Sequence, residues 1–182
     1  MPSNRVIETV YLGQFSSVDK VNASSLYKPG ELGARAAVNN TEWQLVQLDS
    51  GATAATGVGV VAAGQAAYWK DKSTYLVTNN FLQAVGTTTG ARNEVAGVFQ
   101  TAVTAGNYCF VQQKGRSVNA IKLASSSPNI GDWIVADNTG STAQFAIVAI
   151  ATAPTVRSYG LAAAAGSSVT TIAADLDVPG IP

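Results

Sequence analysis

Helical periodicity is almost absent from this 182-residue sequence, and this absence narrows the possible folds more than any other feature. No stretch keeps apolar residues at three- and four-residue spacing for more than about two turns before Gly, Pro or a β-branched residue interrupts it. Short segments rich in β-branched and aromatic residues are frequent instead, as is typical of strands. They lie at 44–48, 75–78, 95–103, 108–111, 118–123, 133–135 and 144–150.

Clusters of turn-forming residues separate these segments. They include 105–107, 114–116, 127–132 and 137–141, where Gly, Asn, Asp, Ser and Pro gather. Short strands joined by such turns pack as two sheets or close into a barrel. The sequence therefore predicts an all-β fold, a sandwich or barrel of short antiparallel strands with extended N- and C-terminal arms. The residues expected to be mostly buried are Val46, Leu48, Leu76, Val98, Phe110, Val111, Ile121, Trp133, Ile134, Phe145 and Ile147.

The chain divides into three regions by composition. Residues 1–40 read as an N-terminal arm with the first short strands, 41–152 as the sandwich or barrel body, and 153–182 as a C-terminal extension. In both end regions, isolated large apolar groups stand among small and polar residues that cannot build a core locally. We expect these groups to contact a neighbouring subunit or a larger lattice, with packing back onto their own body as the alternative. The residues expected at such an interface are Tyr11, Leu12, Phe15, Tyr27, Tyr159 and Leu161.

The chain carries little charge. It has 11 basic and 11 acidic residues, and charged residues make up 12% of it, against roughly 25% in typical domains. A neutral surface repels other copies weakly, which suits a subunit of an assembly and favours a closed homo-oligomer, expected to be a trimer. No basic cluster indicates a nucleic-acid partner. No membrane partner is expected either, because the longest apolar runs, 57–63 and 145–153, are shorter than the ~20 residues of a membrane-spanning helix.

Few residues offer chemistry. The sequence has no histidine, which removes imidazole-based triads and histidine metal sites. The one cysteine, Cys109, cannot form an internal disulfide, and we expect it to be a small buried core residue. Ser17 and Lys20 match a Ser-x-x-Lys nucleophile pattern without its companion motifs, so we interpret them as a solvated loop. Residues 57–62 fit Gly-x-Gly-x-x-Ala but lack the long helix of a dinucleotide site, so we interpret them as a strand or bulge.

The acidic residues are spread singly along the chain. Asp175 and Asp177 share one face of an extended segment and offer oxygens to calcium, although a solvated tail is the expected state. Trp43, Trp69 and Trp133 lie in or beside strand segments, where core packing is expected and a carbohydrate-stacking platform is the alternative. We therefore expect no catalytic residues, no metal, no cofactor and no small-molecule substrate. An enzyme that uses dispersed carboxylates is the weaker alternative.

Two segments carry a resemblance to a protein family. The first, PGELGARAAVNNTEWQLVQL at 29–48, has a leucine and a glycine, a short strand, a polar turn and an aromatic-bearing strand. The second joins VAGVFQ at 95–100 to AGNYCFVQQKG at 105–115, a Gly-Asn-Tyr strand that ends in a Lys-Gly turn. These patterns resemble the capsid decoration, or cement, proteins of tailed bacteriophages. The likeness spans residues 29–140.

The resemblance implies a β-rich, trimer-prone structural protein without enzymatic activity. Such a protein is made in the host cytoplasm, sits on the capsid exterior of the virion, binds the major capsid protein lattice and stabilises the head. The first 28 residues and the long C-terminal segment have no counterpart in the pattern, so the mode of attachment is open. The alternative function is a carbohydrate- or receptor-binding β module of a phage fibre or surface protein, in which exposed Trp and Tyr side chains stack on sugars.

Overall fold

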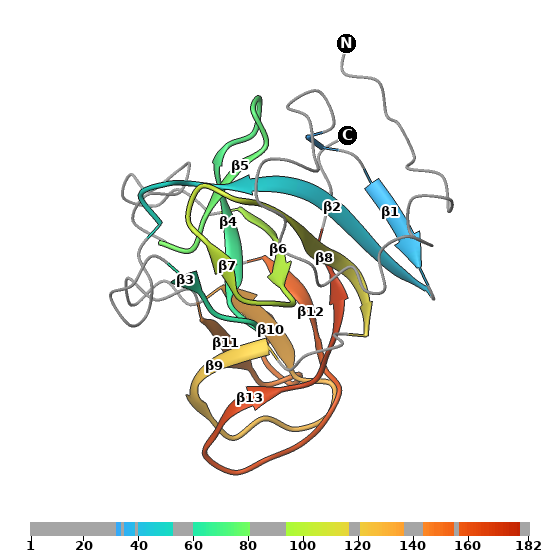
Figure 1. Cartoon of the computed structure of the whole chain (residues 1–182). Coiled ribbons are helices and arrows are strands. Elements are labelled where there is room, and N and C mark those ends of the chain that lie inside the picture. The colour runs from blue at the N-terminus through green and yellow to red at the C-terminus, as the bar shows by residue number, and fades with distance from the viewer. Residues whose placement is uncertain are drawn as a thin grey trace.

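The computed structural model of the chain describes residues 32–33, 35–38, 40–52, 60–80, 94–116, 121–136, 144–154 and 157–178. The regular secondary structure in these ranges consists of strands, and these ranges contain no helix (Figure 1). The strands are β1 (Arg35–Val38), β2 (Thr41–Leu48), β3 (Val60–Val61), β4 (Ala66–Asp71), β5 (Leu76–Thr78), β6 (Val95–Phe99), β7 (Val103–Thr104), β8 (Tyr108–Arg116), β9 (Ile121–Ser126), β10 (Trp133–Ala136), β11 (Phe145–Val148), β12 (Ser158–Ala162), β13 (Val169–Ile172) and β14 (Ala174–Asp177).

A closed barrel forms the first part of the fold. In the order β2, β5, β4, β6 and β8, each strand pairs with the next, and β8 pairs back with β2 to close the ring. The closing pair is antiparallel and runs from Glu42 opposite Lys114 to Gln47 opposite Tyr108. Figure 1 shows β1 beside β2 at the outside of this ring. Closure pairs the strands that would otherwise be the two edges of this sheet.

Alternation along the barrel strands explains which side chains fill the interior. Val46 and Leu48 of β2 lie in one apolar cluster with Cys109 and Val111 of β8, and successive side chains of a strand point to opposite faces. Trp69 of β4 belongs to the same cluster and is the largest side chain in it. The full cluster is Val46, Leu48, Ala52, Val61, Ala67, Trp69, Val77, Ala96, Phe99, Val103, Cys109 and Val111. Side chains thus fill the interior, as in small barrels generally.

A second group of strands continues from the barrel through β8. Strand β14 pairs with the end of β8, and β12, β10, β11, β9 and β13 follow in that order. A second apolar cluster joins these strands to the outer face of the barrel, where Tyr68 and Val98 pack with residues such as Ile134 and Phe145. In Figure 1, β9 and β13 lie at the lower end of the molecule, away from β1 and β5. Strand β8 is therefore shared between the barrel and the second sheet.

The predicted all-β fold is confirmed, and the architecture is a closed barrel with additional strands. Each of the seven predicted strand segments overlaps a strand of the structure. Two strand pairs, β2–β5 and β9–β11, are parallel, so the predicted antiparallel arrangement has two exceptions. Among the residues expected in the core, Leu76, Trp133 and Ile147 are half-buried and the others are buried.

The C-terminal segment is not an extended arm within the described residues. Its three strands, β12, β13 and β14, pair with β10, β9 and β8 of the predicted body. Ile172 and Leu176 are buried in the second apolar cluster. The sequence prediction failed here because Gly, Ala and Ser weaken the local strand signal, while the pairing partners lie far away in the sequence. Residues 1–31 of the predicted N-terminal arm lie outside the described residues.

Candidate functional site

Two of the six residues predicted at an interface lie in the described part of the chain, and both belong to β12. Tyr159, in β12, is 3% exposed and packs in the second apolar cluster. This corrects the expectation for Tyr159, because a ring buried in its own chain has no surface to offer a neighbour. Leu161 in the same strand is half-buried, and its place at an interface stays a prediction. The remaining predicted residues lie outside the described ranges: Tyr11, Leu12, Phe15 and Tyr27.

The two sequence motifs with a catalytic or nucleotide interpretation fall largely outside the described residues as well. Ser17 and Lys20 of the Ser-x-x-Lys pattern lie outside the described residues, as do residues 57–59 of the Gly-x-Gly-x-x-Ala pattern. Val60–Val61, which follow the latter, form strand β3 and pair with β7. A dinucleotide-binding loop leads into a helix at this point. The strand interpretation of this segment is therefore confirmed for its described part.

Most acidic residues in the described ranges have a bonding partner. Ion pairs join Glu42 to Lys114, Asp49 to Lys70, Glu94 to Lys72 and Asp175 to Arg116. Asp71 and Asp132 accept hydrogen bonds from neighbouring loop residues, and Asp177 is exposed beyond Asp175 on the same face of β14. Within the described residues, no three His, Cys, Asp or Glu side chains are grouped so that they could hold a metal ion. Over the same residues, no helix is long and apolar enough to cross a membrane.

The described tryptophans pack into the protein. Trp43 and Trp69 are buried and Trp133 is half-buried. Trp69 meets Tyr75 edge to face, with ring centroids 6.3 Å apart. Among the aromatic side chains of the described ranges, Tyr75 and Trp133 are half-buried and the others are buried. Cys109 is buried as expected, and burial raises the pKa of its thiol, which keeps it protonated.

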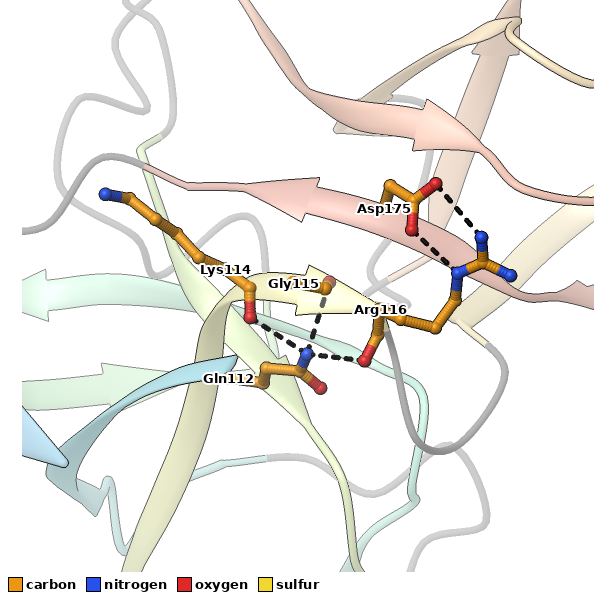
Figure 2. Close-up of polar contacts among 5 residues, drawn as sticks. All are labelled: Gln112, Lys114, Gly115, Arg116 and Asp175. Carbon is orange, nitrogen blue, oxygen red and sulfur yellow. Dashed lines mark hydrogen bonds and ion pairs between the residues drawn. The ribbon is translucent and has the colours of Figure 1, made fainter. Parts of the chain in front are cut away.

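One buried side chain organises the end of β8. Gln112 is 0% exposed, and its Nε2 donates to the carbonyl oxygens of Lys114 (3.1 Å), Gly115 (3.3 Å) and Arg116 (2.9 Å) (Figure 2). An amide nitrogen carries two hydrogens, so the three acceptors share them. The last residues of β8 therefore curl around this side chain. We call Gln112, Lys114, Gly115, Arg116 and Asp175 the β8 junction.

The β8 junction joins the barrel to the second sheet. Gly115 has a φ of +86°, which bends the strand. Beyond the bend, Arg116 lies opposite Asp175 of β14, and its Nε donates to Oδ1 at 2.7 Å while Nη2 donates to Oδ2 at 3.3 Å (Figure 2). The predicted turn at 114–116 is wrong, because these residues continue strand β8 and a glycine with positive φ also serves to bend a strand.

A second polar centre ties two loops together. Asp132 is 3% exposed, and its Oδ2 accepts the backbone N–H of Asn129 at 2.8 Å while its Oδ1 accepts that of Ile150 at 3.0 Å. The backbone N–H of Gly131 donates to the carbonyl oxygen of Ala162 at 2.8 Å. These bonds fix loop 127–132, between β9 and β10, against loop 149–154, which follows β11. We call these two loops the isoleucine tip, because they carry Ile130 and Ile150.

Replacement of Asp132 by Asn should destabilise the protein at neutral pH and reduce its sensitivity to acid. The backbone N–H groups of Asn129 and then Ile150 hold the pKa of Asp132 below its ordinary value of 3.8. A group with a lowered folded-state pKa stabilises the fold above its unfolded pKa, and this contribution is lost as the pH falls through the folded value. The difference between wild type and variant should therefore shrink below about pH 4. Urea titrations at neutral and acidic pH measure it.

Asp71→Asn is the control for this prediction. Hydrogen bonds from the side chains of Ser73 and Thr74 lower the pKa of Asp71, which is the last residue of β4. Ser73 and Thr74 lie in the exposed turn before β5, where water replaces lost bonds. Its replacement should cost less stability at neutral pH than that of Asp132. A stability difference between wild type and Asp132→Asn that stays constant from neutral to acidic pH would contradict the assignment.

Comparisons with known proteins return little. No protein-family model and no curated protein sequence matches the chain. Among solved structures, the N-terminal base of the head fiber protein gp8.5 of bacteriophage phi29 aligns with 77% of this chain and 97% of its own, at 13% identity and a TM-score of 0.43. A TM-score of this size does not establish a common fold, so the likeness assigns no function to this chain.

Proposed function

We propose that this chain is a non-enzymatic structural protein of a tailed-bacteriophage head. In this proposal it is a decoration or cement subunit that binds the outer face of the major capsid protein lattice and stabilises the particle. It acts on the capsid exterior, and its partners are the capsid protein and other copies of itself. The proposal rests on the architecture and the sequence pattern together.

The observation that carries the proposal is where the two family-like segments lie. The described part of 29–48 forms β1 and β2, and the segments at 95–100 and 105–115 supply β6 and most of β8. Strand β8 pairs with both β2 and β6, so the two segments build one continuous wall of the barrel. The resembling pattern thus coincides with a unit of tertiary structure, which supports a shared architecture over a chance match of turn residues.

The physical character of the fold suits this role. The five barrel strands pair around a closed ring, so the barrel itself offers no open edge for unwanted sheet extension at high local concentration, and the sheet ends at β1 and β13. The net charge of zero lets many copies sit side by side on a particle without strong repulsion. We propose that the copies assemble as trimers where capsid subunits meet, because a closed rotational assembly matches the local symmetry of such a lattice.

Binding to heads that lack the protein tests the proposal. Purified protein is mixed with such heads, and the bound amount is measured by co-sedimentation over a range of concentrations. We expect saturable binding at a fixed number of copies per head and a higher temperature of head disruption. Light scattering on the free and the released protein measures the oligomer, expected to be a trimer. Heads that bind no protein, or that bind it without any gain in stability, would overturn the cement role.

A further inference from the structure

We propose that the isoleucine tip is the surface that docks onto the capsid, with Ile130 and Ile150 as its central contacts. This inference rests on the proposed function and adds to it the contact face and the chemistry of its partner. The partner surface is an uncharged apolar recess on the capsid protein. The geometry of the tip supports the inference in three steps.

The first step is the exposure of the two side chains. Ile130 is 71% exposed and Ile150 is 58% exposed, and they are the two exposed large apolar side chains of the described residues. They lie on loops held together by Asp132, and the Cδ1 of Ile150 is 3.4 Å from the position that a Cβ on Gly131 would take. The side chain of Ile150 thus lies beside the residue that follows Ile130, so the two exposed isoleucines belong to one local surface, unlike scattered surface apolar residues, which are ordinary.

The second step is the rigidity of the patch. The carboxylate of Asp132 fixes both loops, and the backbone N–H of Ala162 donates to the carbonyl oxygen of Asp132 at 2.8 Å. From the other side, the N–H of Gly166 donates to the carbonyl oxygen of Pro128 at 3.0 Å. A surface held in one conformation loses little conformational entropy on binding. The tip therefore has the preorganisation of a docking surface.

The third step identifies the partner. The two loops contain no Lys or Arg, and their one acid, Asp132, is buried in hydrogen bonds. Loops that enter membranes usually combine apolar residues with basic ones, so a lipid surface is disfavoured. A stable dimer buries roughly 1,200–2,000 Å², and two isoleucines flanked by Ala149, Ala151 and Ala153 form a far smaller patch. A capsid lattice presents the same recess many times. A trimer can therefore bind through several small apolar contacts at once, and its overall affinity exceeds that of one contact.

The test compares three forms of the full chain in binding to heads that lack the protein. In one, Ile130→Ser and Ile150→Ser remove the apolar groups; in the second, Ile130→Leu and Ile150→Leu retain them. Thr104→Ala, at an exposed position of β7 in the barrel part, is the control. We expect the serine variant to need about tenfold more protein for half-saturation or worse. The leucine and control variants should stay close to wild type, and all should unfold at the wild-type temperature, since the changed side chains are exposed.

The outcomes separate this inference from the proposed function. If wild type saturates heads and the serine variant does so at the same concentration, the tip is not the contact and the cement role stands. If wild type does not bind heads at all, both the proposed function and this inference are overturned. Loss of trimer in the serine variant would assign the tip to a second copy. Sedimentation of wild type, but not of the serine variant, with phosphatidylcholine vesicles would assign it to lipid. Either result overturns the inference.

Discussion

Replacing Gln112 with glutamate is expected to lower the free energy of unfolding by about 3–5 kcal/mol at neutral pH, the cost of leaving a buried charge without a partner. The two side chains have nearly the same shape, so packing is preserved. The exchange places a carboxylate oxygen where Nε2 now donates to the carbonyl oxygens of Lys114, Gly115 and Arg116. Four oxygens then face one another in a site that is closed to water, since Gln112 is fully buried.

The destabilisation should depend on pH in a defined direction. Burial and the surrounding carbonyls raise the pKa of the introduced carboxyl above the roughly 4.3 of an unfolded glutamate. The protonated carboxyl donates one hydrogen bond, so the stability of the variant comes closest to that of wild type below the pKa of the unfolded glutamate. Its relative stability then falls as the pH rises through the window between the unfolded and the folded pKa. Urea titrations of both proteins across this range measure the difference and cancel the acid sensitivity that they share.

Gln112→Met is the matched variant for this prediction. Methionine has a similar length but neither donates nor accepts, so it loses the three bonds and also removes Oε1, which has no hydrogen-bond partner in the structure. We expect its stability to lie between those of wild type and the glutamate variant at neutral pH, without the pH dependence. A glutamate variant within about 1 kcal/mol of wild type at neutral pH, where one buried hydrogen bond is worth that much, would show that water reaches the junction.

Gly115→Ala is expected to destabilise the protein by about 3 kcal/mol or more, from backbone strain and a steric clash together. Gly115 has a φ of +86°, a conformation that an L side chain adopts at a cost. A Cβ at this position would also collide with the backbone carbonyl oxygen of Asn40 and lie 3.0 Å from the Cγ2 of Thr41. Backbone cannot move aside without disturbing the β1–β2 hairpin, so relaxation is limited. Chemical denaturation of the purified variant measures the loss.

Gly106→Ala is the control that separates the two causes. Gly106 also has a φ of +86°, but nothing lies within 4 Å of the position of a Cβ there. Its replacement should cost only the strain of the positive φ, about 1–2 kcal/mol. The excess cost at Gly115 therefore measures the close approach to Asn40. Equal losses in the two variants would show that the β1–β2 hairpin yields freely and that the β8 junction is not tightly packed.

The strands of the body could be predicted from local sequence because their signal is local. Residues such as Val46, Leu48 and Val111 alternate with polar neighbours or stand in short β-rich runs, and turn residues bound them. A strand with this pattern has one face to bury, whichever strand it pairs with. The all-β class, most core positions and the core role of Trp69 followed from this reasoning.

The pairing partners of the strands could not be predicted from local sequence, because they depend on residues that are distant in the sequence. Tyr159 stands among small residues, and its sequence is equally compatible with burial in its own chain or against a neighbour. Only the pairing of β12 with β10 and β14 places its ring in the second apolar cluster. The strict alternation of Ala174–Asp177, with Asp175 and Asp177 outward, was a strand signal that the composition of the segment obscured.

The β8 junction and the isoleucine tip could not be predicted from local sequence for the same reason. A glutamine in a strand gives no sign that its amide will meet three carbonyls around a bent strand end, and an isoleucine in a Pro-Asn-Ile-Gly loop ordinarily predicts burial. Ile130 and Ile150 are exposed on two loops that are distant in sequence and adjacent in space, and the carboxylate of Asp132 binds backbone groups of both loops. Local sequence decides which segments are strands and turns. Contacts between distant segments decide which side chains remain on the surface to meet a partner.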